Sequence, residues 1–158
     1  MSDLIIGAKK YINNALFYAI ASVIPISLLP FCIDEEMIPH EMFPIVVALL
    51  FWFCIVGETI CLYKANKLCK LEEQRKKLIP VYRYGIVRFG RTTSARCADI
   101  CLLVSIIVLF VLEIRRFENV WIQTIITIVL ILSLQLHSIF NGEIYSTINK
   151  YMHRRKDK

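Results

Sequence analysis

The sequence predicts an all-α membrane protein with four transmembrane helices, both termini in the cytoplasm and a second helix that is extended into the cytoplasm. Two observations support the fold class. The 158 residues are 57% hydrophobic with a mean hydropathy of +0.58, which is typical of membrane proteins. The apolar runs are also close to the ~20 residues that cross a hydrocarbon core of about 30 Å. They cover residues 12–33, 43–63, 98–114 and 120–140.

A soluble helical bundle would look different. Its helices would carry a polar face at a 3.6-residue period, whereas Ile100–Leu112 and Ile125–Leu134 are apolar nearly all round. The four spans use about half of the chain, so residues 1–158 form one membrane domain without room for a separate folded domain.

The distribution of positive charge predicts the orientation. The segment 64–96 holds ten Lys or Arg, against only Glu72 and Glu73, while the short segment before Met42 is acidic and has no Lys or Arg. Lys9 and Lys10 precede the first span, and the tail after residue 149 is basic. Because cytoplasmic loops carry the excess of Lys and Arg, we expect an N-in/C-in multi-pass protein of the bacterial inner membrane.

The first two spans have recognisable local features. Pro25 and Pro30 lie in the outer half of the first span, where each removes a backbone donor, so a kink or an early helix end is expected. We expect this span to remain uncleaved. The second helix continues through Lys64–Leu78, which is rich in good helix formers, and Pro80 should end it at or before Ile79.

The remaining elements follow in order. The segment 64–96 is a basic cytoplasmic loop, and Thr92, Thr93 and Ser94 are natural caps for the third helix. The third and fourth spans form a tight hairpin around Arg115–Asn119. We expect the tail Asn141–Lys158 to extend the fourth helix and to be exposed.

Glu58 is the first candidate for a functional residue. It lies about five residues from the inner end of the second span, where a carboxyl group costs roughly 2.5–3.5 kcal/mol on insertion scales. Asp99, Arg96 and His137 lie at a similar depth in the other spans. The sequence therefore predicts an intramembrane polar cluster of these four residues. Two readings stay open, namely a proton or ion relay and a polar clasp between helices or protomers.

The basic loop contains a short internal repeat. Arg83-Tyr84-Gly85 is followed by Arg88-Phe89-Gly90 and Arg91. Basic loops at this position attract anionic lipid headgroups, at about 1 kcal/mol per residue, or bind an acidic cytoplasmic protein. Direct nucleic-acid contact, with phosphates on arginines and bases on rings, is the third reading. The residues expected to bind a partner or headgroups are Lys76, Lys77, Arg83, Tyr84, Arg88, Phe89 and Arg91.

Motifs of catalysis are missing from the sequence. It has no Ser–His–Asp pattern, no glycine-rich phosphate loop, no H-E-x-x-H and no C-x-x-C pair, so we expect neither an enzyme nor a cofactor. Cys54, Glu58 and Cys61 share a helix face, as do Cys97 and Cys101. None of them repeats at a recognised ligand spacing, and no metal is expected.

These features predict a small homo-oligomer whose basic face recruits a cytoplasmic protein partner. The architecture of four spans, cytoplasmic termini and a basic cytoplasmic face resembles the membrane subunit of Kiwa-type bacterial antiphage systems. That resemblance covers architecture alone and implies a membrane sensor or effector of antiviral defence that works with a cytosolic DNA-binding partner. The alternatives are a subunit of an ion or proton-coupled channel or transporter, and an immunity protein against a pore-forming toxin.

Overall fold

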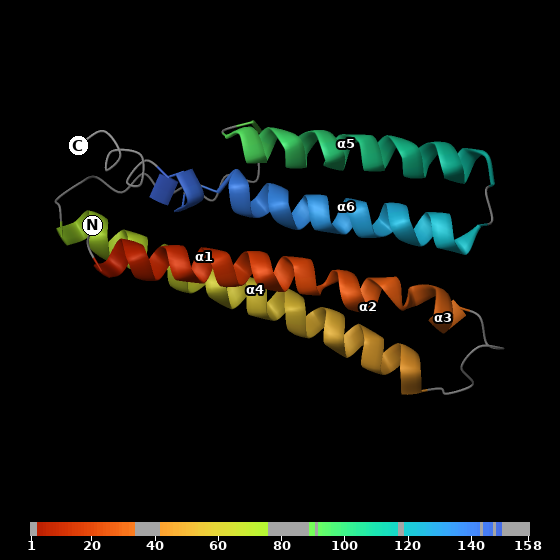
Figure 1. The fold of residues 1–158 in the computed structure, drawn as a ribbon, viewed down its shortest axis with the longest axis horizontal. Coiled ribbons are helices and arrows are strands. Elements are labelled where there is room, and N and C mark those ends of the chain that lie inside the picture. Colours follow the sequence, from red (N-terminus) through yellow and green to blue (C-terminus); the bar gives the residue numbers. More distant parts are fainter. Residues whose placement is uncertain are drawn as a thin grey trace.

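The computed structural model describes residues 3–33, 42–75, 89–90, 92–116, 119–142, 144–146 and 148–149. Its elements are helices: α1 (Asp3–Ala21), α2 (Val23–Ser27), α3 (Leu29–Ile33), α4 (Met42–Arg75), α5 (Thr93–Ile114) and α6 (Val120–Phe140). The consecutive helices α1, α2 and α3 lie end to end and form a single rod (Figure 1). Four helical segments are long and apolar enough to cross a membrane, which confirms the predicted all-α class with four spans.

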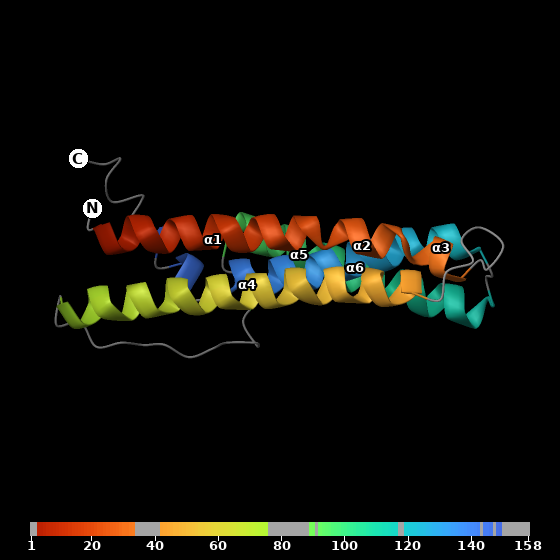
Figure 2. The same cartoon turned by 90° about the horizontal axis from the view of Figure 1, so that it is seen from below.

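The helices pack as two antiparallel pairs. α1 lies along α4 and α5 lies along α6, while α6 also contacts α1 and α2 (Figures 1 and 2). One end of the bundle is therefore formed by the starts of α1 and α5 and the ends of α4 and α6. We call it the basic end, because Lys9, Lys10, Lys64 and Arg96 lie in the parts of α1, α4 and α5 toward that end.

The first rod is interrupted at the two positions where proline was expected to act. α1 ends at Ala21, four residues before the buried Pro25, and α2 ends at Ser27, before Pro30. Proline lacks the N–H that would continue each hydrogen-bond ladder. The hydroxyl of Ser22 donates to the Ala19 carbonyl at 2.7 Å, and the hydroxyl of Ser27 donates to that of Ile24 at 2.7 Å. The expected disruption is confirmed, and the chain continues in the same direction.

α4 is longer than a membrane is thick. Its 34 residues at about 1.5 Å each give about 51 Å, compared with a hydrocarbon core of about 30 Å. The Lys64 ammonium lies 5.7 Å from the centre of the Tyr11 ring, so the two helices change from apolar to polar at the same level. The prediction that the second helix continues past Lys64 is confirmed as far as Arg75. Its expected end near Ile79 lies outside the described residues.

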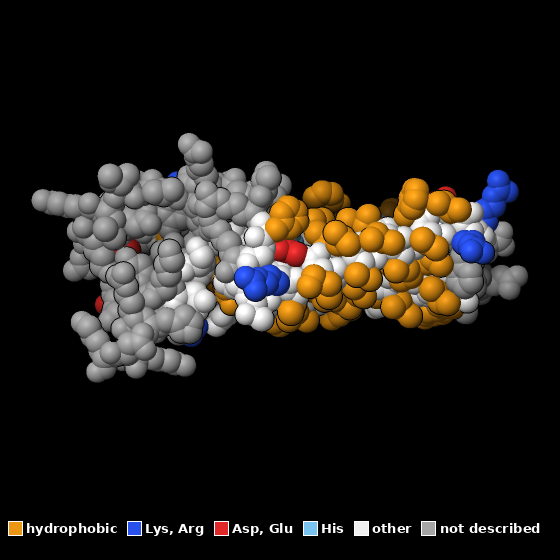
Figure 3. Space-filling model, turned by 90° about the horizontal axis from the view of Figure 1, so that it is seen from above, with side chains coloured by type: hydrophobic (Ala, Val, Ile, Leu, Met, Phe, Trp, Pro, Cys, Tyr) orange, Lys and Arg blue, Asp and Glu red, His pale blue; other side chains and the backbone are white. Residues whose placement is uncertain are grey.

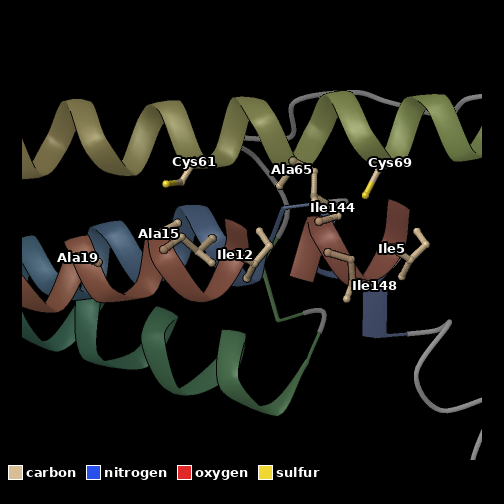
Figure 4. Close-up of a cluster of buried hydrophobic side chains, with 11 residues drawn as sticks. Ile5, Ile12, Ala15, Ala19, Cys61, Ala65, Cys69, Ile144 and Ile148 are labelled. Carbon is tan, nitrogen blue, oxygen red and sulfur yellow. The ribbon is translucent and has the colours of Figure 1, made fainter. Parts of the chain in front are cut away.

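The basic end has its own hydrophobic core. Ile144 and Ile148, which follow α6, are only 9% and 5% exposed. They pack in one cluster with Ile5, Ala65 and other residues of α1 and α4 (Figure 4). The expectation that the tail is exposed is therefore wrong for these residues. α6 ends at Phe140, the chain bends at Asn141 and Gly142, and residues 144–146 and 148–149 are helical again. Their two isoleucines cover α1 and α4.

The buried face of α1 recurs every third or fourth residue. It comprises Ile5, Ala8, Ile12, Ala15 and Ala19, a spacing that keeps one stripe against the neighbouring helices. Small side chains let helix backbones approach closely, which is how helices associate where lipid is as apolar as leucine.

The outward surface is apolar between two charged ends. On α5, Ile100, Leu103, Ile107 and Phe110 are exposed, and hydrophobic side chains cover the described part of this face between its charged ends (Figure 3). Lys and Arg side chains lie at both ends of the apolar region (Figure 3). In water such a surface would be very costly, so it fits contact with lipid.

Candidate functional site

The polar centre of the molecule lies between α5 and α6 at the basic end. Asp99 is in the second turn of α5, and His137 and Asn141 are four residues apart at the end of α6. Residues at this spacing are neighbours on one side of a helix, so both face the carboxyl group of Asp99. His137 and Asn141 are buried and Asp99 is half-buried.

The Asp99 carboxylate accepts three hydrogen bonds. Its Oδ1 lies 2.5 Å from His137 Nδ1 and accepts from Asn141 Nδ2 at 2.8 Å. Its Oδ2 accepts from the backbone N–H of Gly90 at 2.7 Å. Asn141 Nδ2 also lies 3.1 Å from His137 Nδ1. Since an ionised carboxylate is only an acceptor, the arrangement fits a His137 tautomer with its proton on Nδ1, and the contact with Asn141 joins two donors.

Gly90 is held from two sides. Besides its N–H bond to Asp99, its carbonyl oxygen accepts from Arg96 Nε at 3.2 Å. Its φ of +70° is a left-handed conformation that glycine adopts without steric cost. We call Gly90, Arg96 and Asp99 the Gly90 clamp. Through it, the end of the basic loop is attached to α5.

Two further contacts support the clamp. The Phe89 ring lies 5.0 Å from the His137 ring, although most of the Phe89 side chain is exposed. Thr92 caps α5, and its Oγ1 accepts from the Ala95 N–H at 3.1 Å. A cap satisfies one of the open donors at a helix start, so the first turn of α5 is fixed two residues after Gly90. The predicted capping role is confirmed for Thr92.

The structure brings together three of the four residues of the predicted polar cluster. Asp99 and His137 are in direct contact, and Arg96 joins them through the Gly90 carbonyl. Glu58 does not join them. It lies on α4, which packs on α1, while Asp99 and His137 belong to the α5–α6 pair. The predicted polar centre is therefore divided into two places.

Glu58 is buried without a polar partner among the described residues. Its side chain is 6% exposed, and it lies on the face of α4 that turns toward α1, with Cys54 and Cys61. The adjacent Gly57 touches Tyr18 of α1, since a Cβ on Gly57 would lie 2.7 Å from the Tyr18 ring. A carboxyl group in such surroundings is a candidate for function by default.

A third polar contact joins the break in the first rod to α6. Ser22 is fully buried, and its hydroxyl lies 3.0 Å from Gln135 Oε1. Gln135 Nε2 has no hydrogen-bond partner within the described part of the chain, and the O and N of an amide are assigned from their contacts. With the Gln135 amide flipped, Nε2 donates to Ser22 Oγ, and the Ser22 hydroxyl donates only to the Ala19 carbonyl oxygen. In both arrangements, Ser22 links α1 and α2 to α6.

Most of the predicted binding residues of the loop fall outside the described part. These are Lys76, Lys77, Arg83, Tyr84, Arg88 and Arg91, whereas Phe89 is described and contacts His137. Sequence reasoning missed Gly90 as an anchor and Ser22 as a link. The repeated Arg-aromatic-Gly motif marks the segment around Gly90. It does not predict that the backbone N–H of Gly90 binds Asp99, because a backbone group has no sequence signature.

The arrangement fixes the positions of its polar groups. The three donors hold the Asp99 carboxylate in place, and no nucleophile is aligned on His137 among the described residues. Within the same residues, no three His, Cys, Asp or Glu side chains are grouped to hold a metal ion. Cys97 and Cys101 are exposed on α5, while Cys54 and Cys61 are buried on α4.

Comparison with known proteins adds no further identification. No protein-family model matches the chain, and no curated protein or solved structure matches it significantly.

Proposed function

We propose that this protein is a small, oligomeric, multi-pass protein of the bacterial inner membrane that recruits a cytoplasmic partner protein, as a sensor or effector of antiviral defence. Its termini and its basic end face the cytoplasm. The excess of Lys and Arg at that end supports this orientation. The basic loop presents Arg83, Arg88 and Arg91 to an acidic surface of the partner.

The Gly90 clamp is the observation that supports this proposal best. A loop that only covered the membrane surface would need no fixed attachment. Here the end of the loop is bound to α5 through both its N–H and its carbonyl group, and Phe89 lies on His137. A change in the packing of α5 against α6 would therefore move the loop. This gives the membrane part a physical means to alter what the loop presents.

The recruitment proposal makes a direct prediction. Changing Arg83, Arg88 and Arg91 together to Gln should abolish copurification of a cytoplasmic partner, because charge-assisted contacts with carboxylates are lost. The measurement is affinity purification of the membrane protein in mild detergent, followed by mass spectrometry. The matched control changes Arg115 and Arg116 to Gln at the opposite end and should leave the partner bound. Retention of the partner by the triple variant would contradict the proposal.

Glu58 favours a second candidate function, a proton-coupled channel or transporter subunit. A buried carboxyl group without a polar partner among the described residues is the usual feature of a proton-carrying site within a membrane. In this case Glu58→Gln should abolish proton flux into liposomes while the oligomer persists on size-exclusion chromatography. If Glu58 is a polar clasp between helices instead, the same variant should lower the thermal stability of the protein in detergent without a specific loss of flux. Unchanged flux and unchanged stability would exclude both roles for Glu58.

A further inference from the structure

One side of the α1–α4 pair is defined by three contacts. A Cβ on Gly7 would lie 3.1 Å from Leu68 Cδ1, the Tyr11 ring lies under the Lys64 ammonium, and the Tyr18 ring touches Gly57. Residues 7, 11 and 18 of α1 are separated by four and seven positions, so they lie along one side of that helix. We call the outer surface along this line of contacts the α1–α4 seam.

The basic end of the seam is cationic. Lys10 and Asn14 of α1 are exposed and four residues apart, and they flank Tyr11. Lys64 and Lys67 of α4 are exposed and three residues apart. These spacings place each pair on one helix face.

Among the described residues, the cationic part of the seam has no anionic neighbour to neutralise it. Among the acidic side chains described at the basic end, Glu58 and Glu72 are buried and Asp99 is bound in the clamp. Asp3 is exposed at the far start of α1. The exposed lysines are therefore available to an anion.

The same seam continues as an aromatic surface. Phe17 and Phe53 are 68% and 66% exposed. Tyr18 lies between them, with ring centres 5.9 Å from Phe17 and 6.1 Å from Phe53. Gly57 leaves this part of α4 without a side chain, and Ile60 lies between it and Lys64. The positions 53, 57, 60, 64 and 67 repeat at intervals of four and three, so the aromatic and cationic parts share one face of α4.

The two parts lie at depths that match a phospholipid. Phe17 is six residues beyond Tyr11, which is about 9 Å along the helix. The lysines are level with Tyr11 or nearer the basic end, whereas Phe17 and Phe53 lie within the apolar runs 12–33 and 43–63. An anion without a hydrocarbon chain would use only the first part of this surface. A soluble acidic protein would not reach the second.

From this geometry we propose that the α1–α4 seam binds an anionic phospholipid of the leaflet at the basic end. Its phosphate group contacts Lys10, Lys64 and the amide of Asn14, while an acyl chain lies across Phe17, Tyr18 and Phe53. Lys67 adds a second positive charge at the headgroup. The proposal requires that the helices cross a membrane, but it does not depend on partner recruitment.

The test compares lipid binding by the full chain in detergent, by native mass spectrometry. Phosphatidylglycerol should be retained in preference to phosphatidylcholine of the same chain length. Changing Lys10 and Lys64 together to Gln should weaken phosphatidylglycerol binding roughly 25-fold, at about fivefold per lysine near the headgroups. The Arg115→Gln, Arg116→Gln variant removes the same charge at the opposite end and should bind as the wild type does.

Further variants and a competitor distinguish binding of a whole phospholipid from binding of a free phosphate group. Phe17→Ala should weaken long-chain phosphatidylglycerol binding without changing the preference over phosphatidylcholine, and free glycerol phosphate should not compete. The Lys10→Arg, Lys64→Arg variant keeps both charges, so it should bind phosphatidylglycerol as the wild type does, and a loss of binding in this variant would contradict the proposal. Equal retention of both lipids, equal losses in the two Gln variants, or full competition by glycerol phosphate would overturn the proposal.

Discussion

Replacing Asp99 with alanine is expected to lower the free energy of unfolding by about 3 kcal/mol, the scale seen when one partner of a buried pair is removed. The change deprives three groups of their acceptor, namely His137 Nδ1, the Asn141 amide and the Gly90 N–H. Each unsatisfied buried donor costs about 1–3 kcal/mol. The measurement is thermal or denaturant unfolding of the detergent-solubilised protein.

The matched control is Glu113→Ala, because Glu113 is an exposed acid on the same helix. This surface change should alter the unfolding free energy by less than about 0.5 kcal/mol. An Asp99→Ala variant as stable as the control would show that the polar centre does not hold α5 to α6.

The same substitution should also release the end of the basic loop. Trypsin cleavage after Arg91, next to the clamp, is expected to become several-fold faster in Asp99→Ala. Gly90→Ala disrupts the clamp from the other side, because a residue with a Cβ at a φ of +70° costs roughly 1–2 kcal/mol. It should speed the same cleavage while the Asp99–His137 contact stays intact. An unchanged cleavage rate in both variants would show that Asp99 holds α5 to α6 but does not hold the end of the basic loop.

The membrane class, the four spans and several local features could be predicted because they depend on nearby residues. Span length follows from the apolar runs. The breaks before Pro25 and Pro30 follow from the missing N–H groups, and the Thr92 cap follows from a hydroxyl before a helix start. The contact between Asp99 and His137 could be expected from their equal depth.

Depth alone could not place Glu58. A sequence gives the level of a residue along the membrane normal, but it does not give the order of the helices around the bundle. Glu58 has nearly the depth of Asp99, yet α4 packs on α1, while α5 packs on α6. Instead of one cluster of four residues, the structure has the pair Asp99 and His137 with Arg96 attached through Gly90, and Glu58 lies apart from them.

The tail shows a different limit. The sequence after Phe140 predicts a helical and exposed tail, and residues 144–146 and 148–149 are indeed helical after a bend at Asn141 and Gly142. Ile144 and Ile148 are instead buried against α1 and α4, at the level where these helices extend beyond Tyr11 and Lys64. Gly142 fits the end of α6, since a Cβ there would lie 3.1 Å from the Ile139 carbonyl oxygen. Local propensity does not detect an apolar surface that belongs to distant segments.

Gly57→Leu should be the most disruptive change in the α1–α4 pair, lowering the free energy of unfolding by about 3 kcal/mol, at the upper end for overpacking. Even a Cβ at this position would lie 2.7 Å from the Tyr18 ring. The ring cannot turn aside freely, because Phe17 and Phe53 lie on it at 5.9 Å and 6.1 Å between ring centres. The two helices would have to separate near Glu58. Thermal unfolding in detergent measures the effect.

A pair of alanine variants sharpens this prediction. Gly57→Ala should still destabilise, whereas Gly7→Ala should be neutral or stabilise by up to about 1 kcal/mol, because alanine favours the helix. A Cβ on Gly7 meets only the mobile end of Leu68, at 3.1 Å, and that methyl group can move. Adding Tyr18→Ala to Gly57→Leu should recover part of the loss, since the added side chain then occupies the space of the ring. If Gly57→Ala were as harmless as Gly7→Ala, the close approach of α1 and α4 beside Glu58 would be contradicted, and with it the aromatic half of the proposed lipid site.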